Sequence, residues 1–377
     1  MMWEIAKLGK IAIIRTGKLD SNAAVIGGRY PFFTCDPNTL SIDVWAYDTE
    51  AVLLAGNNAS GNYTAKYYKG KFNAYQRTYI IESTNEEKLN IRYLCYALNQ
   101  QLQLLKTMSS GSTTKFLTVR MLDNLDIPLP GINIQNQIVN ILSAYDDLIE
   151  NNQKQIKLLE EAAQRLYKEW FVDLRFPGHE NTKIVDGVPE GWSKSTVGNI
   201  CKLRKVVITP DKIESNTPYI GLEHMPRNDI CLSTWGKSEE INSNKFIYLK
   251  KDVLFGKIRP YFHKVGFALN DGITSTDTMV MVADQNLWGL LLVTVSSDEF
   301  VDFSYQNCKE GAKMPRADWK QMEKYAIMIA DQATQKLFEQ EILVITNKIS
   351  ALAFQCRSLR EARDRMLPKL MGGEVEA

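Results

Sequence analysis

Apolar residues recur at steps of three and four along two long segments of the chain. They do so from Ile134 to Trp170 and again from Phe338 to Leu370, which is the spacing that gives a helix one apolar stripe. The first segment contains one additional step of four around the polar Asn152, which is typical of a stutter in a coiled coil. The pattern predicts two long helices, which end at the breakers Pro177-Gly178 and Gly372-Gly373.

Equal length and equal position in the chain favour the pairing of these helices with each other over two unrelated surface helices. Because each helix leaves a globular part in the same way, pairing about a pseudo-twofold axis makes them antiparallel. Pro368 lies within the last helical stretch, and a proline there predicts a kink or an end because it has no N–H to donate.

The segments that precede the long helices contain short apolar runs bounded by Gly, Asn, Asp or Pro, which is typical of strands. Such runs occur at Ile11–Ile14, at Tyr79–Ile81 and at Thr278–Val282. One helix is predicted between Lys88 and Lys106 from its apolar positions. Each globular part is predicted to end in a strand, at Leu125–Pro130 and at Tyr325–Ile329.

The chain repeats itself at a nearly constant spacing. Trp3, Gly9 and Ile11 are matched 189 residues later by Trp, Gly and Ile, and from Gly111 onward the spacing becomes 200. The pairs at this second spacing include Gly111 and Gly311, Ile127 and Ile327, Gln135 and Gln335, and Ile149 and Ile349. The predicted organisation is therefore an α+β tandem repeat of two mixed α/β globular parts, at 1–131 and 177–331. Each is followed by a long helix, at 132–176 and 332–373.

Composition places few limits on function. The chain has 377 residues, enough for two or three domains, and its 24% of charged and 45% of hydrophobic residues are typical of a globular protein. A net charge of +1 neither favours nor excludes a polyanionic partner, because an average hides patches. No apolar run reaches about 18 residues and no secretory signal begins the chain, so a cytoplasmic protein is expected.

No catalytic or metal-binding constellation is predicted. Gly56 and Gly61 match the first half of a phosphate-binding loop, but Asn62-Tyr63 stands where Lys-Ser or Lys-Thr is needed. No Gly-x-Gly-x-x-Gly opens a helix, and no Asn-Pro-Pro-Tyr tetrapeptide can present a flipped base. The six cysteines form no Cys-x-x-Cys pair, which argues against structural zinc. The three histidines, each predicted to be a surface or core residue, are His179, His224 and His263.

Two segments in matching positions of the copies combine cations with aromatic rings. Residues 63–81 carry four cations and no acid, and residues 245–264 carry six cations and one acid. Lysine and arginine neutralise phosphates, while amides and arginine read base edges. A strand edge protected by lysines also fits the pattern, but its recurrence favours nucleic acid. The candidate contacts are Lys66, Lys69, Lys71, Arg77, Lys257, Arg259, Tyr261, His263 and Lys264, with Asn57, Asn58 and Asn62 as candidates for base contact.

A glycine loop precedes each long helix and adds weaker candidates. Residues 109–115 are rich in hydroxyls, and residues 309–316 are basic. Such loops suit phosphate contact but also suit an ordinary exposed turn. The candidates here are Ser112, Thr113, Lys115, Lys313 and Arg316.

These motifs, in this order and twice over, resemble the DNA-specificity subunit of Type I restriction–modification enzymes across nearly the whole chain. The resemblance rests on Trp192–Gly198 with its weaker copy at Trp3, on Asp252–Pro260, on Ile134–Ile138 and on Leu166–Phe171. It implies two target-recognition domains that each read one half of a split DNA site. It also implies an antiparallel coiled coil that sets the spacing of the half-sites and docks the modification subunits.

The same resemblance implies that catalysis lies in other chains. Two modification subunits bind S-adenosylmethionine and methylate adenine, and restriction subunits translocate and cut DNA. This chain is then a non-catalytic subunit that binds double-stranded DNA and no cofactor of its own. A coiled-coil scaffold whose globular parts bind protein, and an enzyme with unrecognised motifs, are the alternatives.

Overall fold

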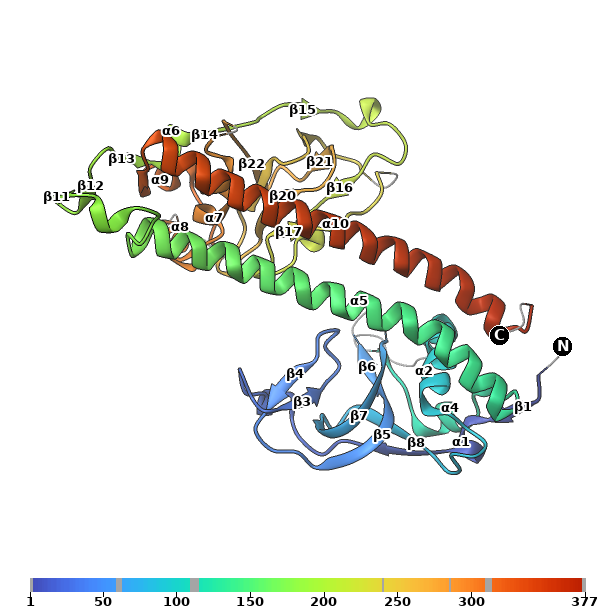
Figure 1. Ribbon diagram of the computed structural model, residues 1–377. Coiled ribbons are helices and arrows are strands. Elements are labelled where there is room, and N and C mark those ends of the chain that lie inside the picture. The colour runs from blue at the N-terminus through green and yellow to red at the C-terminus, as the bar shows by residue number, and fades with distance from the viewer. Residues whose placement is uncertain are drawn as a thin grey trace. The chain divides into compact units, whose positions relative to one another are not determined.

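The computed structural model describes residues 3–58, 63–108, 115–238, 241–284, 286–308 and 314–374 (Figure 1). The chain divides into two compact units. The first unit is Met1–Leu148 with Leu359–Ala377, and the second is Ile149–Ser358. Each unit contains a globular part and a part of each long helix, which confirms the predicted α+β class.

The long helices are α5 (Ile132–Tyr167), which continues as a π-helical segment over Lys168–Val172, and α10 (Gln332–Met371). Their halves pack antiparallel within each unit, as predicted. In the second unit, Asn152 Nδ2 donates to Gln355 Oε1 at 3.1 Å. Asn152 is only 4% exposed, so the polar residue at the predicted stutter forms a buried hydrogen bond between the helices.

The second helix does not end at Pro368, so of the predicted kink or end, the end is wrong. The helix α10 continues through Pro368 to Met371. Because the proline lies in the last turn, its missing N–H removes one hydrogen bond and leaves the rest of the ladder intact. The helix ends at the following glycines, where Gly373 adopts a φ of 69° and its N–H donates to Leu370 O at 3.2 Å.

Among its described residues, the first unit contains a six-stranded sheet in the order β2-β8-β5-β7-β3-β4. The helix α2 (Ile91–Gln100) packs against β5 and β7. The predicted 88–106 helix is broken at Gln101, and α3 (Leu102–Met108) follows. The strands are β2 (Ala12–Thr16), β3 (Tyr30–Phe33), β4 (Leu40–Ile42), β5 (Tyr47–Ala55), β7 (Ala65–Ala74) and β8 (Thr78–Ser83).

The second unit repeats this strand order. Its described residues contain a five-stranded sheet in the order β14-β22-β19-β20-β17, and both sheets place one parallel pair, β3 with β7 and β17 with β20, after antiparallel neighbours. The strands are β14 (Cys201–Leu203), β17 (Cys231–Leu232), β19 (Val253–Gly256), β20 (Val265–Ala268) and β22 (Thr278–Ala283).

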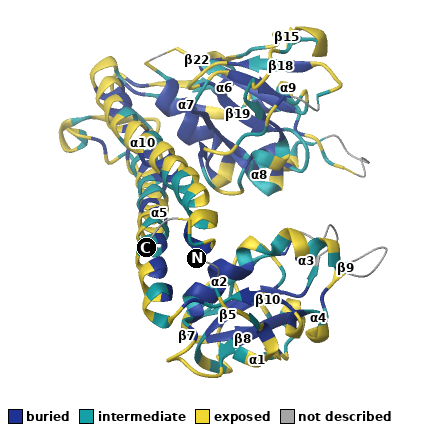
Figure 2. Ribbon diagram, turned by 90° about the vertical axis from the view of Figure 1, so that its right-hand side faces the viewer, coloured by how far each residue is buried: buried dark blue, intermediate teal, exposed yellow. Residues whose placement is uncertain are grey.

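The same unit contains a four-stranded sheet in the order β15-β18-β21-β16, whose strands alternate along the chain with those of the five-stranded sheet. Its strands are β15 (Val207–Ile208), β16 (Tyr219–Ile220), β18 (Lys245–Tyr248) and β21 (Gly272–Thr274). The helix α7 (Trp288–Val295) is buried along its whole length (Figure 2), and α8 (Asp298–Gln306) follows it. A hairpin of β11 (Ile184–Val185) and β12 (Val188–Pro189) follows α5.

The tryptophan-led segments of the two copies occupy equivalent places. The strand β1 (Ile5–Lys7) pairs with β10 (Asp126–Pro128), and β13 (Ser193–Thr196) pairs with β23 (Ala326–Ile329). Short helices follow β1 and β13 and precede β10 and β23: α1 (Leu8–Ile11), α4 (Val119–Asp123), α6 (Val197–Ile200) and α9 (Trp319–Met322). The start of each copy is thus joined to the strand that leads into its long helix.

Two buried glutamates of the long helices form hydrogen bonds with the backbone of the globular part of the second unit. Glu160 of α5 accepts hydrogen bonds from the N–H groups of Ile230 and Cys231 at 2.9 and 3.2 Å. Glu339 of α10 accepts from the N–H groups of Gly289 and Leu290 at 2.6 and 3.0 Å, at the start of α7. These bonds satisfy backbone donors that would otherwise be buried without a partner.

Candidate nucleic-acid interface

Three loops of the second unit meet at one end of the five-stranded sheet. Leu203 pairs with Met281 and Gly256 pairs with Thr278 in antiparallel register. Because antiparallel neighbours run in opposite directions, β14 and β19 end where β22 begins. The residues that follow β14, follow β19 and precede β22 therefore lie together.

Backbone hydrogen bonds join a fourth segment to these loops. Lys257 N donates to Asp277 O at 2.8 Å, and Lys257 O accepts from Ala317 N at 2.9 Å. Arg259 N donates to Pro315 O at 2.9 Å. We call this set of backbone bonds the loop frame of the second unit. It holds residues 257–259 between the turn at 275–277 and the segment at 315–317.

The side chain of Lys257 is fixed within the frame. Its amine donates to Thr276 O at 2.7 Å and lies 5.6 Å from the ring centroid of Phe246. Burial lowers the pKa of Lys257, and Lys205 and Arg316 lower it further, whereas Asp277 raises it. Lys257 is therefore held in place by the protein and is only partly exposed to solvent.

Three cations and one carboxylate interact electrostatically at this frame. Arg316 Nη1 lies 3.3 Å from Asp277 Oδ1, and Lys205 and Lys257 are close enough to act on one another electrostatically. We call these four residues the basic cluster: Lys205, Lys257, Asp277 and Arg316. An excess of positive charge on a set of adjacent loops suits a polyanion.

The first unit builds the same loop frame. Gly56 N donates to Arg77 O at 2.8 Å, and Gly56 O accepts from Leu117 N at 2.8 Å. Strand β6 (Asn57–Asn58) pairs with β9 (Lys115–Phe116), as Ile258 bridges to Arg316 in the second unit. Gly56 and Lys257 make matching backbone hydrogen bonds, so the two positions are equivalent. The side chains on the equivalent positions differ between the units.

The two units carry different residues at two equivalent positions of the frame. Arg77 stands in the first unit where Asp277 stands in the second, and Phe116 stands where Arg316 does. Arg77 is exposed, so its guanidinium is accessible at the frame. The two frames therefore share a backbone and present different functional groups.

The predicted cations of β7 do not all reach the frame. Lys66 pairs with Leu53 near the end of β5, whereas Lys71 pairs with Asp48, roughly 17 Å further along the strand. Lys69 forms an ion pair with Glu50 at 2.8 Å. The structure thus places Lys66 close to the frame and Lys69 and Lys71 away from it.

Other groups of the same chain contact some of these lysine side chains. The Lys66 amine lies 3.3 Å from Asp36 O and 3.2 Å from Thr39 Oγ1, and burial lowers its pKa while Asp36 opposes this. The Lys71 amine lies 4.8 Å from the ring centroid of Trp45, which is 45% exposed.

The asparagine and loop candidates are only partly described. Asn57 Oδ1 is buried and accepts no hydrogen bond from the described part of the chain. Lys115 lies opposite Asn58 in the β6–β9 pair, and the side chain of Asn58 is outside the description. The remaining candidates that lie outside the described residues are Asn62, Ser112, Thr113 and Lys313.

Arg259 and Tyr261 lie on the turn that leaves the second frame. Arg259 adopts a φ of 50°, and its guanidinium lies 5.8 Å from the ring centroid of Phe262. Tyr261, in the 3₁₀ turn η6 (Pro260–Phe262), is 45% exposed. Tyr261 is therefore accessible to a partner that contacts the frame.

The side chains of His263 and Lys264, by contrast, contact other groups of the second unit. His263 Nε2 lies 2.9 Å from Ser296 O, and its Nδ1 lies 3.2 Å from an Asp298 carboxylate oxygen. The amine of Lys264 donates to Leu222 O. These contacts join the turn to neighbouring parts of the unit.

Lys205 and Asp277 were not among the residues singled out from the sequence. Lys205 follows Arg204, which matches Arg15 in the repeat, and Asp277 lies in a short turn before an apolar strand. Neither position has a signal of its own. The strand register is what brings them to Lys257 and Arg316.

Within the described ranges, no group of three or more His, Cys, Asp and Glu side chains is arranged to hold a metal ion. None of the helices in those ranges combines the length and apolar character needed to span a bilayer.

Comparison with known proteins identifies the family. The family model described as the Type I restriction modification DNA specificity domain matches residues 2–161. The Type I restriction enzyme EcoDI specificity subunit of Escherichia coli is 30% identical over 307 residues, which are 73% of this chain and 66% of that protein. The MjaIX specificity subunit of Methanocaldococcus jannaschii is 26% identical over 301 residues, 75% of this chain and 68% of that protein.

The fold is shared with a solved structure. The S subunit of a Type-I restriction-modification system from M. genitalium superposes with a TM-score of 0.61 at 16% sequence identity. That match covers 98% of this chain and 96% of the other. With the repeated loop frame and the paired long helices, these similarities lead to one conclusion: the chain belongs to the family of Type I restriction enzyme DNA specificity subunits.

Proposed function

We propose that this chain is a sequence-specific DNA-binding subunit of a Type I restriction–modification complex, and that each globular part reads one half of a bipartite site. The observation that carries the proposal is the loop frame, which occurs once in each unit with different side chains. A repeated backbone with unlike functional groups suits two unlike half-sites, because base edges are distinguished by donors and acceptors on side chains.

The charge at the second frame supports the same proposal. Three cations against one carboxylate attract a phosphate backbone. DNA affinity that depends on such attraction falls as the salt concentration rises. Arg77, Lys66 and Lys115 bring cations to the first frame or near it. The exposed aromatic Tyr261 adds a surface for a base or sugar.

We further propose that the chain itself is not catalytic and acts with two modification subunits and, in complete systems, with two restriction subunits. The paired halves of α5 and α10 are proposed to set the spacing of the half-sites and to dock the modification subunits. S-adenosylmethionine is proposed to bind to the modification subunits. The names of the curated relatives, which are subunits of restriction enzymes, support this division of labour.

Selection from a randomised duplex library, made with the modification subunit present, tests the proposal. The expected result is a bipartite consensus whose binding falls steeply with salt and is lost when either half is scrambled. Equal recovery of all duplexes contradicts it, and tight binding of protein alone would then favour a coiled-coil scaffold. Methyl transfer by the purified chain alone would contradict the non-catalytic role.

A further inference from the structure

We propose that Asp277 and Arg316 together read one G·C base pair in the half-site of the second unit. Arg316 donates to the guanine edge, and Asp277 accepts from the cytosine amino group. The inference rests on the proposed DNA-binding function and assigns the base-reading chemistry to two side chains of the basic cluster.

The carboxylate of Asp277 is out of place in a simple phosphate site. It interacts with Arg316 and Lys257, and its negative charge weakens the attraction of these cations for a phosphate backbone. The frame does not need this carboxylate, because Lys257 N bonds to the backbone oxygen of Asp277. Neither the frame nor phosphate binding therefore explains the Asp277 carboxylate, and we assign it to contact with a base.

Both side chains are accessible to a partner. The side chain of Asp277 is 32% exposed and that of Arg316 is 58% exposed. An exposed pair of this kind adds little to stability, so its contacts can be exchanged for a ligand at low cost. Lys257, whose amine is held by Thr276, is the more fixed member of the cluster.

The chemistry of the pair matches one base pair. In the major groove, guanine presents two acceptors, N7 and O6, and cytosine presents an adjacent amino donor. The 3.3 Å between Arg316 Nη1 and Asp277 Oδ1 is close to the roughly 2.9 Å that separates hydrogen-bonded groups within a base pair. A guanidinium beside a carboxylate therefore offers donors and an acceptor in the required order.

The first unit lacks this pair. At the equivalent places it has Phe116 and Arg77, an aromatic ring and a single cation. The same frame therefore cannot read a G·C pair through a coupled donor and acceptor in the first half-site. The inference predicts that the two half-sites differ at the base pair that faces this position.

Library selections with Asp277→Asn and Arg316→Lys test the inference. Asp277→Asn removes the negative charge and exchanges one of the two acceptor oxygens for an N–H₂ donor, and Arg316→Lys keeps the charge but removes the forked donors. Each variant is expected to lose about tenfold or more of its preference at one base pair of the second half-site. The first half-site should be unchanged, and the salt dependence of Arg316→Lys should equal that of the wild type.

Asp211→Asn is the matched control, because it removes the same charge from an exposed turn of the same unit. Selection of the wild-type second half-site with undiminished preference by both variants would overturn the inference and leave the proposed function standing. An equal loss of affinity for all sequences would also overturn it, because the pair would then only position the loops. Failure of the wild type to select any sequence would instead overturn the proposed function.

Discussion

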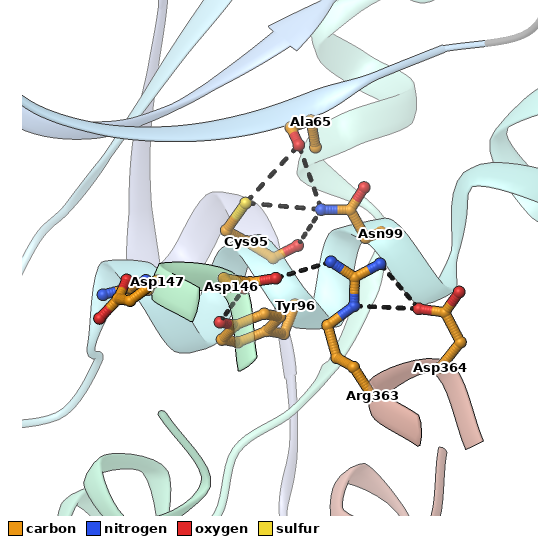
Figure 3. A network of polar contacts seen from close by, with 9 residues as sticks. Ala65, Cys95, Tyr96, Asn99, Asp146, Asp147, Arg363 and Asp364 are labelled. Atoms are coloured by element: carbon orange, nitrogen blue, oxygen red, sulfur yellow. Dashed lines mark hydrogen bonds and ion pairs between the residues drawn. The ribbon is translucent and has the colours of Figure 1, made fainter. Parts of the chain in front are cut away.

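Asp146 of α5 and Arg363 of α10 form an ion pair in the first unit, with Arg363 Nη1 2.6 Å from an Asp146 carboxylate oxygen (Figure 3). The other carboxylate oxygen accepts from the hydroxyl of Tyr96 on α2 at 2.5 Å. One carboxylate thus joins both long helices to the globular part. The side chains of Asp146 and Arg363 are each 28% exposed, so the pair is partly shielded from water.

Replacement of Asp146 is expected to destabilise the first unit. Asp146→Ala removes the carboxylate acceptor of the Tyr96 hydroxyl and the link between Arg363 and α5, although Arg363 keeps its bonds to Asp364. The change should cost about 1–3 kcal/mol in urea unfolding. The neighbouring Asp147, which pairs with Arg92 and is 64% exposed, is the matched control. Asp147→Ala should cost less than about 1 kcal/mol. Equal losses for the two variants would show that the shielding of Asp146 contributes nothing.

The folding stability of the second unit should depend on the ionisation of Glu160. Burial and the Asp229 carboxylate raise the pKa of Glu160 from 4.5 to about 7, against the N–H groups of Ile230 and Cys231. As pH rises from 4.5 to 7, the unfolded chain releases this proton while the folded chain retains it. Stability therefore falls across this window, by roughly 3 kcal/mol in total, and falls no further from this group at higher pH.

Glu160→Gln should remove this loss, because the amide does not ionise and its oxygen can still accept from the two N–H groups. Urea unfolding of the full chain at several pH values between 4.5 and 8 measures the difference from the wild type. Glu161→Gln, one residue along the same helix with a side chain 46% exposed, should keep the wild-type pH dependence. A Glu160→Gln profile parallel to that of the wild type would contradict the raised pKa.

Gly56 is required by the close packing of the first loop frame. A Cβ at this position would lie 2.5 Å from Arg77 O and 2.8 Å from the ring of Tyr79. Tyr79 also donates its hydroxyl to Leu117 O at 2.7 Å, so movement of the ring would break its bond to the residue that follows β9. Gly56→Ala should cost about 1–3 kcal/mol and weaken selection of the first half-site only.

Gly131 provides the control for this change. A Cβ at Gly131 meets nothing within 4 Å, so Gly131→Ala should leave both stability and selection close to the wild type. Loss of selection at both half-sites with Gly56→Ala would indicate general unfolding and contradict a local role for the frame.

The salt dependence of DNA binding should distinguish cations at the frame from those away from it. Lys205→Gln should lower the slope of log affinity against log salt by about 1, as expected for one lost phosphate contact. Lys69, ion-paired with Glu50 and further along β7, is the comparison. Lys69→Gln should leave the slope unchanged, and an equal reduction in both variants would contradict the placement of the interface at the loop frames.

The sequence by itself determined the features that local pattern encodes. The spacing of apolar residues predicted the two long helices, because one face of a helix must be apolar to be buried. The matched positions predicted two copies of one unit, and the order of the motifs pointed to the family. Asn152 was visible as an irregularity in the pattern, although its bond to Gln355 was not.

The tertiary structure alone decided which charged residues lie together. Lys205, Lys257, Asp277 and Arg316 are spread over more than a hundred positions. The first three meet because β14, β19 and β22 pair in one register, and backbone bonds to residues 257–259 add Arg316. Lys66 and Lys71 are near neighbours in sequence, yet the extended backbone of β7 separates them. Strand pairing depends on contacts between residues far apart in the chain, and local periodicity contains no information about them.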